Sequence, residues 1–294
     1  MRITLFLFLL ATIAMVSCKP EKLKSSQGFE YIVHKSTGGA KPNAGDYVYF
    51  HAYLRNGDSV IMTSRTQPEM PFFQLPATED PSRKPSPVED VLKLLSIGDS
   101  VTILFPLDTF KTKPMGFENA DMLYYDVVLL DVKTDAQFKE IEAEKRKEQM
   151  AQAEIVMARM PEVEAMVKDN VAKYNSGALA KDLKTTASGL KYIIHQEGAG
   201  MNPAAGQTVT VHYYGALKDG KMFDSSFGRG EPIQFPLGVG QVIAGWDEGL
   251  ALLKEGSKAT FFIPYELAYG EAGSPPVIPA KAELIFYVEL DKIQ

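Results

Sequence analysis

The sequence predicts an α+β protein: two domains, each an antiparallel twisted sheet around a short helix, joined by a helical linker. Three observations carry this prediction. Alternating apolar runs bounded by Gly, Pro and Asn turns occur in both halves of the chain, a charged stretch without glycine separates them, and the two sheet regions repeat each other. With 294 residues and 45% hydrophobic content, the chain can bury two cores.

The N-terminus has the pattern of a secretory signal. Arg2 precedes a predominantly apolar run over residues 3–16, which is shorter than the ~20 residues that a membrane-spanning helix needs. We therefore interpret residues 1–17 as a signal peptide. No later segment of the sequence is apolar enough to span a membrane.

Cys18 is the expected lipidation site. It is the only cysteine of the chain and directly follows Met15, Val16 and Ser17, an order that resembles the lipobox of bacterial lipoproteins, with Met15 in place of the usual leucine. Acyl chains on Cys18, at ~0.8 kcal/mol per buried methylene, would anchor the protein to a membrane. We expect a lipid-anchored protein on the periplasmic or other extracytoplasmic face of the bacterial cell envelope, with residues 18–27 as lipidated cysteine and tether. The alternative is a buried free thiol.

The sequence pattern of residues 28–134 predicts the first sheet domain, and that of residues 135–184 predicts the helical linker. The first region alternates apolar residues between turns, as at residues 47–50. The linker is rich in Glu, Lys, Gln, Ala and Met, with no glycine before Gly177. Pro161 predicts a break between two helices, because proline disfavours helical geometry at the preceding residue and suits a first helical turn. The apolar stripe lacks sustained heptads, so homodimerisation through the linker stays an open alternative.

Residues 185–294 predict the second sheet domain. The expected strands cover residues 190–195, 208–214, 258–263 and 283–290. Gly245 and Gly256 flank an expected short helix over residues 246–253. One helix against a twisted antiparallel sheet is an α+β domain.

The two sheet regions are related by an internal repeat. Gly28–His34 matches Gly189–His195 at a separation of 189 minus 28, or 161 residues, and the same separation pairs His51 with His212. A register shared over several blocks favours two copies of one fold over a chance likeness of alternating strand patterns.

The second copy carries a set of aromatic and aliphatic residues that predicts a small-ligand pocket. They lie in short blocks, each beside a glycine or a turn: Tyr213, Phe223, Asp224, Val242, Ile243, Trp246, Tyr269 and Phe286. Apolar walls with a single carboxylate suit a proline ring. The first copy has Ala52 opposite Tyr213 and about Val88 opposite Trp246. We therefore expect chemistry in the second copy and a binding or spacing role for the first.

These blocks make residues 185–294 similar to the peptidyl-prolyl cis-trans isomerases of the FK506-binding-protein (FKBP) type, and residues 28–134 then resemble a degenerate copy. The resemblance implies a proline pocket with two groups of residues. The catalytic group is Tyr213, Phe223, Asp224, Ile243 and Tyr269, and the substrate-binding group is Val242, Trp246, Ile233, Ile278 and Phe286. Ile233 stands where the family often has phenylalanine, and Pro276 stands where it commonly has glycine.

The implied function is peptidyl-prolyl cis-trans isomerisation that assists the folding of exported proteins, with proline-containing unfolded or partly folded polypeptides as partners. Such catalysis requires no cofactor and no metal, and the four histidines show no metal-ligand spacing. A net charge of −6 without a basic run argues against nucleic acid. Two alternatives stay open: a non-catalytic envelope chaperone or adaptor that binds clients through the N-terminal domain and helical arm, and a structural lipoprotein.

Overall fold

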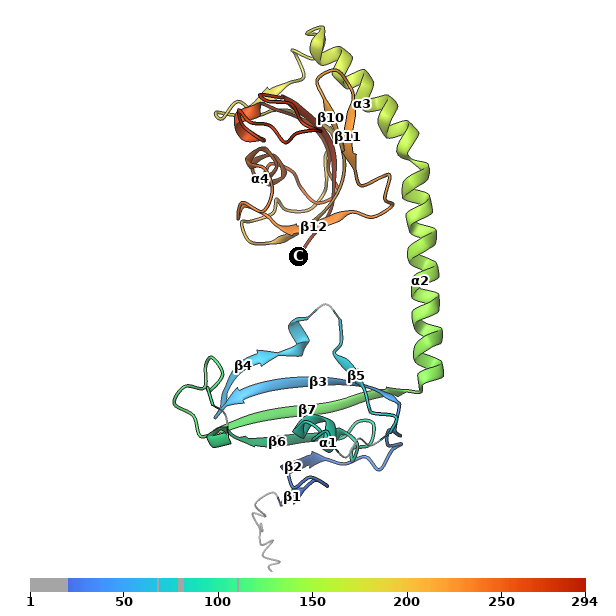
Figure 1. The fold of residues 1–294 in the computed structure, drawn as a ribbon, viewed down its shortest axis with the longest axis vertical. Helices are drawn as coiled ribbons and strands as arrows, with labels where there is room; N and C mark the ends of the chain where they lie inside the picture. Colours follow the sequence, from blue (N-terminus) through green and yellow to red (C-terminus); the bar gives the residue numbers. More distant parts are fainter. Residues whose placement is uncertain (1–20, 68, 79–81, 110) are drawn as a thin grey trace, which may run out of the picture. The chain divides into compact units, whose positions relative to one another are not determined.

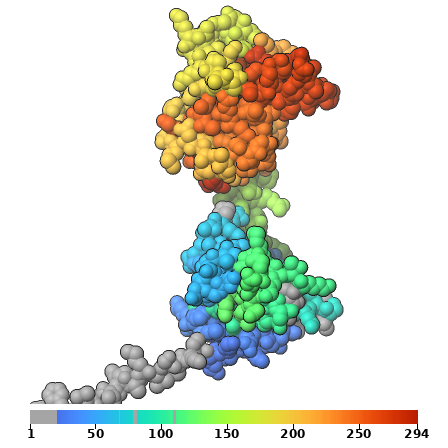
Figure 2. Space-filling model, turned by 90° about the vertical axis from the view of Figure 1, so that its left-hand side faces the viewer, coloured from blue at the N-terminus to red at the C-terminus, as the bar shows by residue number. Residues whose placement is uncertain are grey.

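The computed structural model describes residues 21–67, 69–78, 82–109 and 111–294. The chain divides into two compact units, Met1–Glu144 and Lys145–Gln294, each with its own sheet (Figure 1). The space-filling view shows each unit as a closely packed body (Figure 2). The predicted signal peptide and lipidation site, Cys18, lie outside the described residues. Among the described residues, no helix combines the length and the apolar character needed to cross a membrane.

The N-terminal unit is an antiparallel sheet of seven strands with one short helix on its inner face. The strands are β1 (Lys22–Lys24), β2 (Glu30–Lys35), β3 (Tyr47–Asn56), β4 (Ser59–Thr63), β5 (Phe72–Gln74), β6 (Ser100–Pro106) and β7 (Met122–Lys133). Their order is β1-β2-β6-β7-β3-β4, and β5 also pairs with β3. Helix α1 (Pro87–Leu92) buries Val91 and Leu92 against the sheet, and Ser64–Thr66 and Leu107–Thr109 form 3-10 turns. The Ser86 hydroxyl caps α1 by accepting a hydrogen bond from the Glu89 N–H at 3.2 Å.

The C-terminal unit repeats this architecture. Its strands are β8 (Lys184–Thr185), β9 (Lys191–Gln196), β10 (Thr208–Leu217), β11 (Met222–Ser225), β12 (Ile233–Pro236), β13 (Lys258–Ile263) and β14 (Leu284–Ile293). Their order is β11-β10-β14-β13-β9-β8, with β12 also on β10. Helix α4 (Ala244–Ala251) packs Trp246 and Leu250 into the core, and Tyr265–Leu267 form a 3-10 turn. The predicted α+β architecture with two sheet domains is confirmed.

Two further helices follow β7. Helix α2 spans Asp135–Ala158 and helix α3 spans Met160–Asn175, with Pro161 in the first turn of α3, which confirms the break expected there. Helix α3 runs along the outer side of the C-terminal sheet (Figure 1). Apolar residues on one side of the helix, among them Val163, Val167 and Val171, are buried against this face of the sheet. Helix α3 is therefore part of the C-terminal unit. Homodimerisation through these helices stays a prediction.

The internal repeat is confirmed by polar contacts that recur at matching positions. In both copies two strand histidines lie against hydroxyl groups. The first pair of matching contacts is His34 Nε2 to Thr102 Oγ1 and His195 Nε2 to Thr260 Oγ1, each at 2.7 Å. The second pair is His51 Nδ1 to Ser64 Oγ and His212 Nδ1 to Ser226 Oγ, each at 3.1 Å. The main chain repeats as well. Gly98 and Gly256 each donate a 2.7 Å hydrogen bond, to the carbonyl oxygens of Leu129 and Leu290 respectively.

Candidate functional site

The C-terminal unit contains a cavity of about 400 Å³ between helix α4 and the inner face of the sheet. Its walls come from β10, β11, β12, β14, the turn before α4 and the segment after the last 3-10 turn. The residues that line it are Tyr213, Phe223, Asp224, Ile233, Gln241, Val242, Ile243, Trp246, Tyr269 and Phe286. A mostly apolar concavity with a few polar groups is the usual form of a small-ligand site.

Trp246 forms the floor of the cavity in edge-to-face contacts. Its ring lies 5.1 Å from that of Tyr213 and 5.2 Å from that of Phe286, at interplanar angles of 80° and 83°. Phe223 meets Phe286 at 5.3 Å and 87°. Such contacts between aromatic rings fix their orientation as well as burying area. Because the Trp246 side chain is only 4% exposed, the floor is packed from behind and open only toward the cavity.

Gly215 on β10 makes room for this aromatic arrangement. A Cβ atom at this position would lie 2.7 Å from Phe223 Cζ and 2.8 Å from Phe286 Cε1. Both rings therefore occupy space that any other residue would take. A glycine in a strand interior often marks such a close approach.

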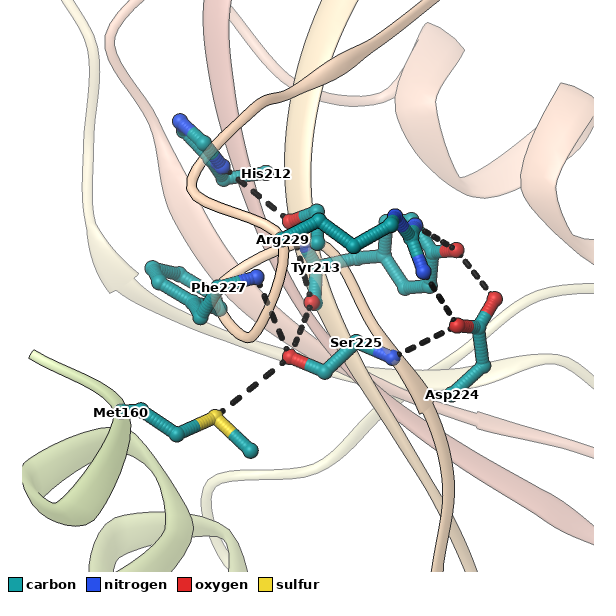
Figure 3. Close-up of polar contacts among 8 residues, drawn as sticks. Met160, His212, Tyr213, Asp224, Ser225, Phe227 and Arg229 are labelled. Atoms are coloured by element: carbon teal, nitrogen blue, oxygen red, sulfur yellow. Dashed lines mark hydrogen bonds and ion pairs between the residues drawn. The ribbon is translucent and has the colours of Figure 1, made fainter. Parts of the chain in front are cut away.

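One side of the cavity carries a charged pair. Arg229 donates to Asp224 Oδ1 at 2.6 Å and to the Tyr213 hydroxyl oxygen at 2.8 Å, and the Tyr213 hydroxyl donates to the other Asp224 oxygen (Figure 3). Burial and the hydrogen bond to Asp224 raise the pKa of Tyr213 to about 12. Burial opposes ionisation of Asp224, but hydrogen bonds from Tyr213 and Arg229 outweigh it and hold the pKa of Asp224 below its ordinary value. At neutral pH the site thus presents a neutral phenol and a carboxylate.

A buried hydroxyl behind this pair ties strand β10 to the first residue after strand β11. Ser226 has no exposed surface, and its Oγ accepts a 2.7 Å hydrogen bond from the Tyr213 N–H. The same oxygen lies 3.1 Å from His212 Nδ1. His212 is therefore a packed residue of the outer sheet face that supports Tyr213 through Ser226, and it does not reach the cavity.

Two hydrogen-bond donors stand at the mouth of the cavity. Ile243 is the N-terminal cap of α4, with extended backbone geometry, and its N–H has no acceptor within the described ranges of the chain. Free N–H groups of this kind are normal at a helix start and are available to a ligand. Tyr269 is 43% exposed, so its hydroxyl is open to solvent or to a bound molecule.

The structure brings together the residues expected at the site, with one placed differently. Ile278 is 5% exposed and belongs to the core cluster around Trp246 rather than to the lining of the cavity. Two contributors were not expected from the sequence: Gln241, next to Val242, and Arg229, in the loop after β11. The only sequence signal for Arg229 is its place five residues after Asp224.

Comparison with known proteins identifies relatives of the C-terminal unit. The family model described as FKBP-type peptidyl-prolyl cis-trans isomerase matches residues 200–291. An FK506-binding protein of Neisseria meningitidis serogroup A is 52% identical over 98 residues, which cover 33% of this chain and 90% of the relative. A probable FKBP-type peptidyl-prolyl cis-trans isomerase FkpA of N. meningitidis serogroup B is 50% identical over 130 residues, which cover 44% of each protein.

The match to the longer relatives is partial. The chain spans less than half the length of the FkpA proteins of N. meningitidis and Aeromonas hydrophila, 44% and 43% respectively. The matched family region ends at residue 291 and includes the blocks that line the cavity from Tyr213 to Phe286.

Proposed function

The chain belongs to the FKBP-type peptidyl-prolyl cis-trans isomerase family, and we propose that its C-terminal unit catalyses rotation about X-Pro bonds of polypeptides. The observation that carries the proposal is the aromatic cavity of about 400 Å³ with Trp246 as floor and Asp224 as its one carboxylate. A proline ring is apolar and small enough for such walls, and the peptide on either side of it leaves through the open mouth.

The proposed chemistry is non-covalent. Rotation about a peptide bond faces a barrier of about 18–20 kcal/mol because the planar amide has resonance that a twisted amide lacks. Twisting localises the nitrogen lone pair and weakens the carbonyl dipole, so an apolar cavity disfavours the twisted amide less than the planar one. Each ~1.36 kcal/mol of preference for the transition state gives about a tenfold increase in rate.

Each side of the cavity has a role in this proposal. Trp246, Val242 and Phe286 hold the proline ring. The free N–H of Ile243 and the hydroxyl of Tyr269 donate to carbonyl groups of the substrate, which fixes the peptide on one side of the rotating bond.

The carbonyl that rotates passes the wall formed by Phe223, Asp224 and Tyr213. The bonds from Arg229 keep that wall in one arrangement before substrate arrives, as electrostatic preorganisation requires.

A matched pair of variants tests the proposal with a short proline peptide whose cis and trans forms are followed by NMR exchange. Phe286 and Tyr125 occupy the same register in the two sheets, facing Gly215 and Leu54 respectively. Phe286→Leu in the full chain is expected to lower kcat/KM on the order of tenfold, because it removes one wall of the ring site. Tyr125→Leu is expected to leave it unchanged. A wild-type chain with no rate above the uncatalysed reaction contradicts the proposal.

We also propose that the protein acts on exported polypeptides from a lipid anchor at Cys18. The basis is the apolar N-terminal run followed at once by the only cysteine. Labelling cells with a radioactive fatty acid should mark the wild-type protein and should not mark Cys18→Ala. Equal incorporation in the two proteins contradicts lipidation at this residue.

A second function, binding of client chains by the N-terminal unit, is favoured by one observation. Strand β4 is the last strand at one edge of its sheet and exposes three successive apolar side chains: Val60 at 52%, Ile61 at 43% and Met62 at 53%. Exposed apolar edges pair readily with other chains. The double variant Val60→Ser, Met62→Ser is expected to suppress aggregation of an unfolded test protein less well than wild type, whereas Val239→Ser, on the C-terminal unit, should not differ from wild type.

A further inference from the structure

The bend between helices α2 and α3 lies directly behind the charged wall of the cavity. Ala153 near the end of α2 touches Gly230, in the β11–β12 loop (residues 226–232). A Cβ atom on Gly230 would lie 2.7 Å from Ala153 Cβ and 2.9 Å from its Cα and carbonyl oxygen. Helix and loop are therefore in contact at the level of the backbone, with no space for an intervening side chain.

A second contact reaches Ser225, the last residue of β11, directly before the same loop. The Ser225 hydroxyl lies 3.6 Å from Met160 Sδ and 3.2 Å from the Tyr213 carbonyl oxygen, and it accepts a 3.2 Å hydrogen bond from the Phe227 N–H (Figure 3). Met160 is the first residue of α3. The start of this helix thus contacts the residue that directly follows Asp224.

Arg159 ties the bend itself to the sheet. Its guanidinium lies 5.2 Å from the centre of the Phe227 ring. It also forms a two-point ion pair with Glu289 on β14, with one of the two bonds at 3.1 Å. Glu289 is 4% exposed, so the bend is held against a buried carboxylate, which is more restrictive than a surface ion pair.

These contacts lie on either side of the ion pair between Asp224 and Arg229 at the cavity wall. Ser225 is the neighbour of Asp224, and Gly230 is the neighbour of Arg229. Packed interiors have few voids and pass small displacements on to their neighbours. We infer that the α2–α3 bend is a positioning element for the cavity, in which Ala153 and Met160 act through Gly230 and Ser225 to hold Asp224 and Arg229 against Tyr213.

The inference rests on the proposed function and concerns residues that do not touch substrate. It also separates two parts of the helical segment. Val163, Val167 and Val171 bury the outer sheet face and contribute to stability alone, whereas Ala153 and Met160 act on the geometry of the cavity.

The test compares the same substitution at two positions of one helix in the full chain. Ala153→Leu places extra atoms against Gly230, and Ala151→Leu, on an exposed position of α2, keeps helix propensity matched. Ala153→Leu is expected to lower kcat on the order of tenfold with KM within about twofold of wild type. Its Trp246 fluorescence, the only tryptophan signal of the chain, should also shift. Ala151→Leu should match wild type in both measurements.

A milder pair of variants applies if Ala153→Leu unfolds the unit. Met160→Leu keeps the apolar volume and removes the sulfur, and Ser225→Ala removes the hydroxyl. Each alone is expected to lower kcat about threefold or more, and the double variant should lose no more than Ser225→Ala alone, because Ser225→Ala already removes the hydroxyl that contacts Met160.

These measurements distinguish a failure of the positioning role from a failure of the proposed isomerase activity. Suppose that wild type is active. If Ala153→Leu then has the same kcat as Ala151→Leu, or if the losses in kcat of the Met160 and Ser225 variants multiply in the double variant, the positioning role is wrong and the proposed isomerase activity is unaffected. If wild type is inactive, the proposed function is wrong, and the positioning role is then tested by Trp246 fluorescence alone. An unchanged fluorescence spectrum in Ala153→Leu overturns the positioning role.

Discussion

The two units share a scaffold and differ at the place where a ligand would bind. The cavity of about 400 Å³ in the C-terminal unit corresponds to a space of about 80 Å³ in the N-terminal unit, between Ala52, Leu54, Met62 and Tyr125 among others. The histidine–serine contact recurs in both, with His51 on Ser64 and His212 on Ser226. Main-chain pairing and shared polar contacts maintain the fold, whereas very few side chains determine whether it has a large cavity at this place.

The strand register identifies the substitutions that close the cavity. Leu54 faces Tyr125 in the N-terminal sheet as Gly215 faces Phe286 in the C-terminal sheet. Ala52 stands where the second unit has Tyr213, and Met62 where it has Asp224. The first unit has therefore lost both the open space and the polar side of the site.

The outer faces of the two sheets differ as well. In the C-terminal unit, Tyr214, Phe262 and Tyr287 are buried beneath α3. In the N-terminal unit the corresponding face carries a polar group, in which Asp126 accepts hydrogen bonds from Arg55 and from Thr102. In the N-terminal unit the start of α2 reaches this face, where Phe138 stacks on Tyr47 at 3.6 Å, whereas in the C-terminal unit α3 buries a whole cluster of aromatic residues.

The largest expected effect comes from closing the cavity at the position that distinguishes the units. Gly215→Ala places a Cβ within 2.8 Å of two aromatic rings, which must then move out of place. We expect kcat/KM in the proline-peptide assay to fall on the order of a hundredfold. Leu54→Ala, the change toward the open form in the other unit, is expected to leave the activity of the full chain unaltered. A fully active Gly215→Ala protein would show that this comparison assigns the wrong residue.

A smaller effect is expected from the contact that the units share. Ser226→Ala leaves the Tyr213 N–H without its acceptor in a fully buried place, which should lower the free energy of unfolding of the C-terminal unit by about 2 kcal/mol. Ser64→Ala removes the matching bond to Ala52 and should destabilise the N-terminal unit by about 1 kcal/mol, since Ser64 is slightly exposed.

Trp246 fluorescence follows unfolding of the C-terminal unit, because the N-terminal unit has no tryptophan. Far-ultraviolet circular dichroism follows both units. Activity should fall in Ser226→Ala and not in Ser64→Ala. Loss of activity in both variants would contradict the assignment of the site to one unit.

The smallest effect concerns Asp291, which stands where the repeat has Leu130. Burial, together with the negative charge of Glu289, raises the pKa of Asp291 from 3.8 to about 6. The Asp291 carboxyl group therefore binds its proton more tightly in the folded state than in the unfolded state. The contribution of Asp291 to stability is therefore fully present below about pH 4 and is lost as the pH rises through 6.

Asp291→Asn removes the loss of stability that accompanies ionisation of this side chain. A shift of this size corresponds to about 3 kcal/mol at most, but the side chain is 40% exposed, and solvent screening reduces the expected gain to about 1 kcal/mol. Denaturant unfolding should show that gain at pH 7.5 and almost none at pH 4. Asp182→Asn, an exposed carboxylate of the same unit, serves as control. A gain that is equal at both pH values contradicts the titration of Asp291.

Much of the fold could be predicted because its signals are local. Alternating apolar residues predict strands, and Pro161 predicts the helix break. The aromatic residues of the site lie in blocks beside glycines, so their grouping could be inferred. Arg229 could not, because its position depends on how the β11–β12 loop turns back toward Asp224. The valines of α3 predict an apolar helix face, but their spacing does not identify the sheet that this face covers.

The strand order has a consequence for the way the protein is made. In each sheet the strand synthesised last, β7 or β14, lies in the middle, between β6 and β3 or between β13 and β10. Neither sheet can close before that strand has left the ribosome, because the last strand alone joins β3 to β6 in one sheet and β10 to β13 in the other. The N-terminal unit reaches this point some 160 residues earlier. A nascent chain therefore passes through an interval in which one unit can fold and the other cannot.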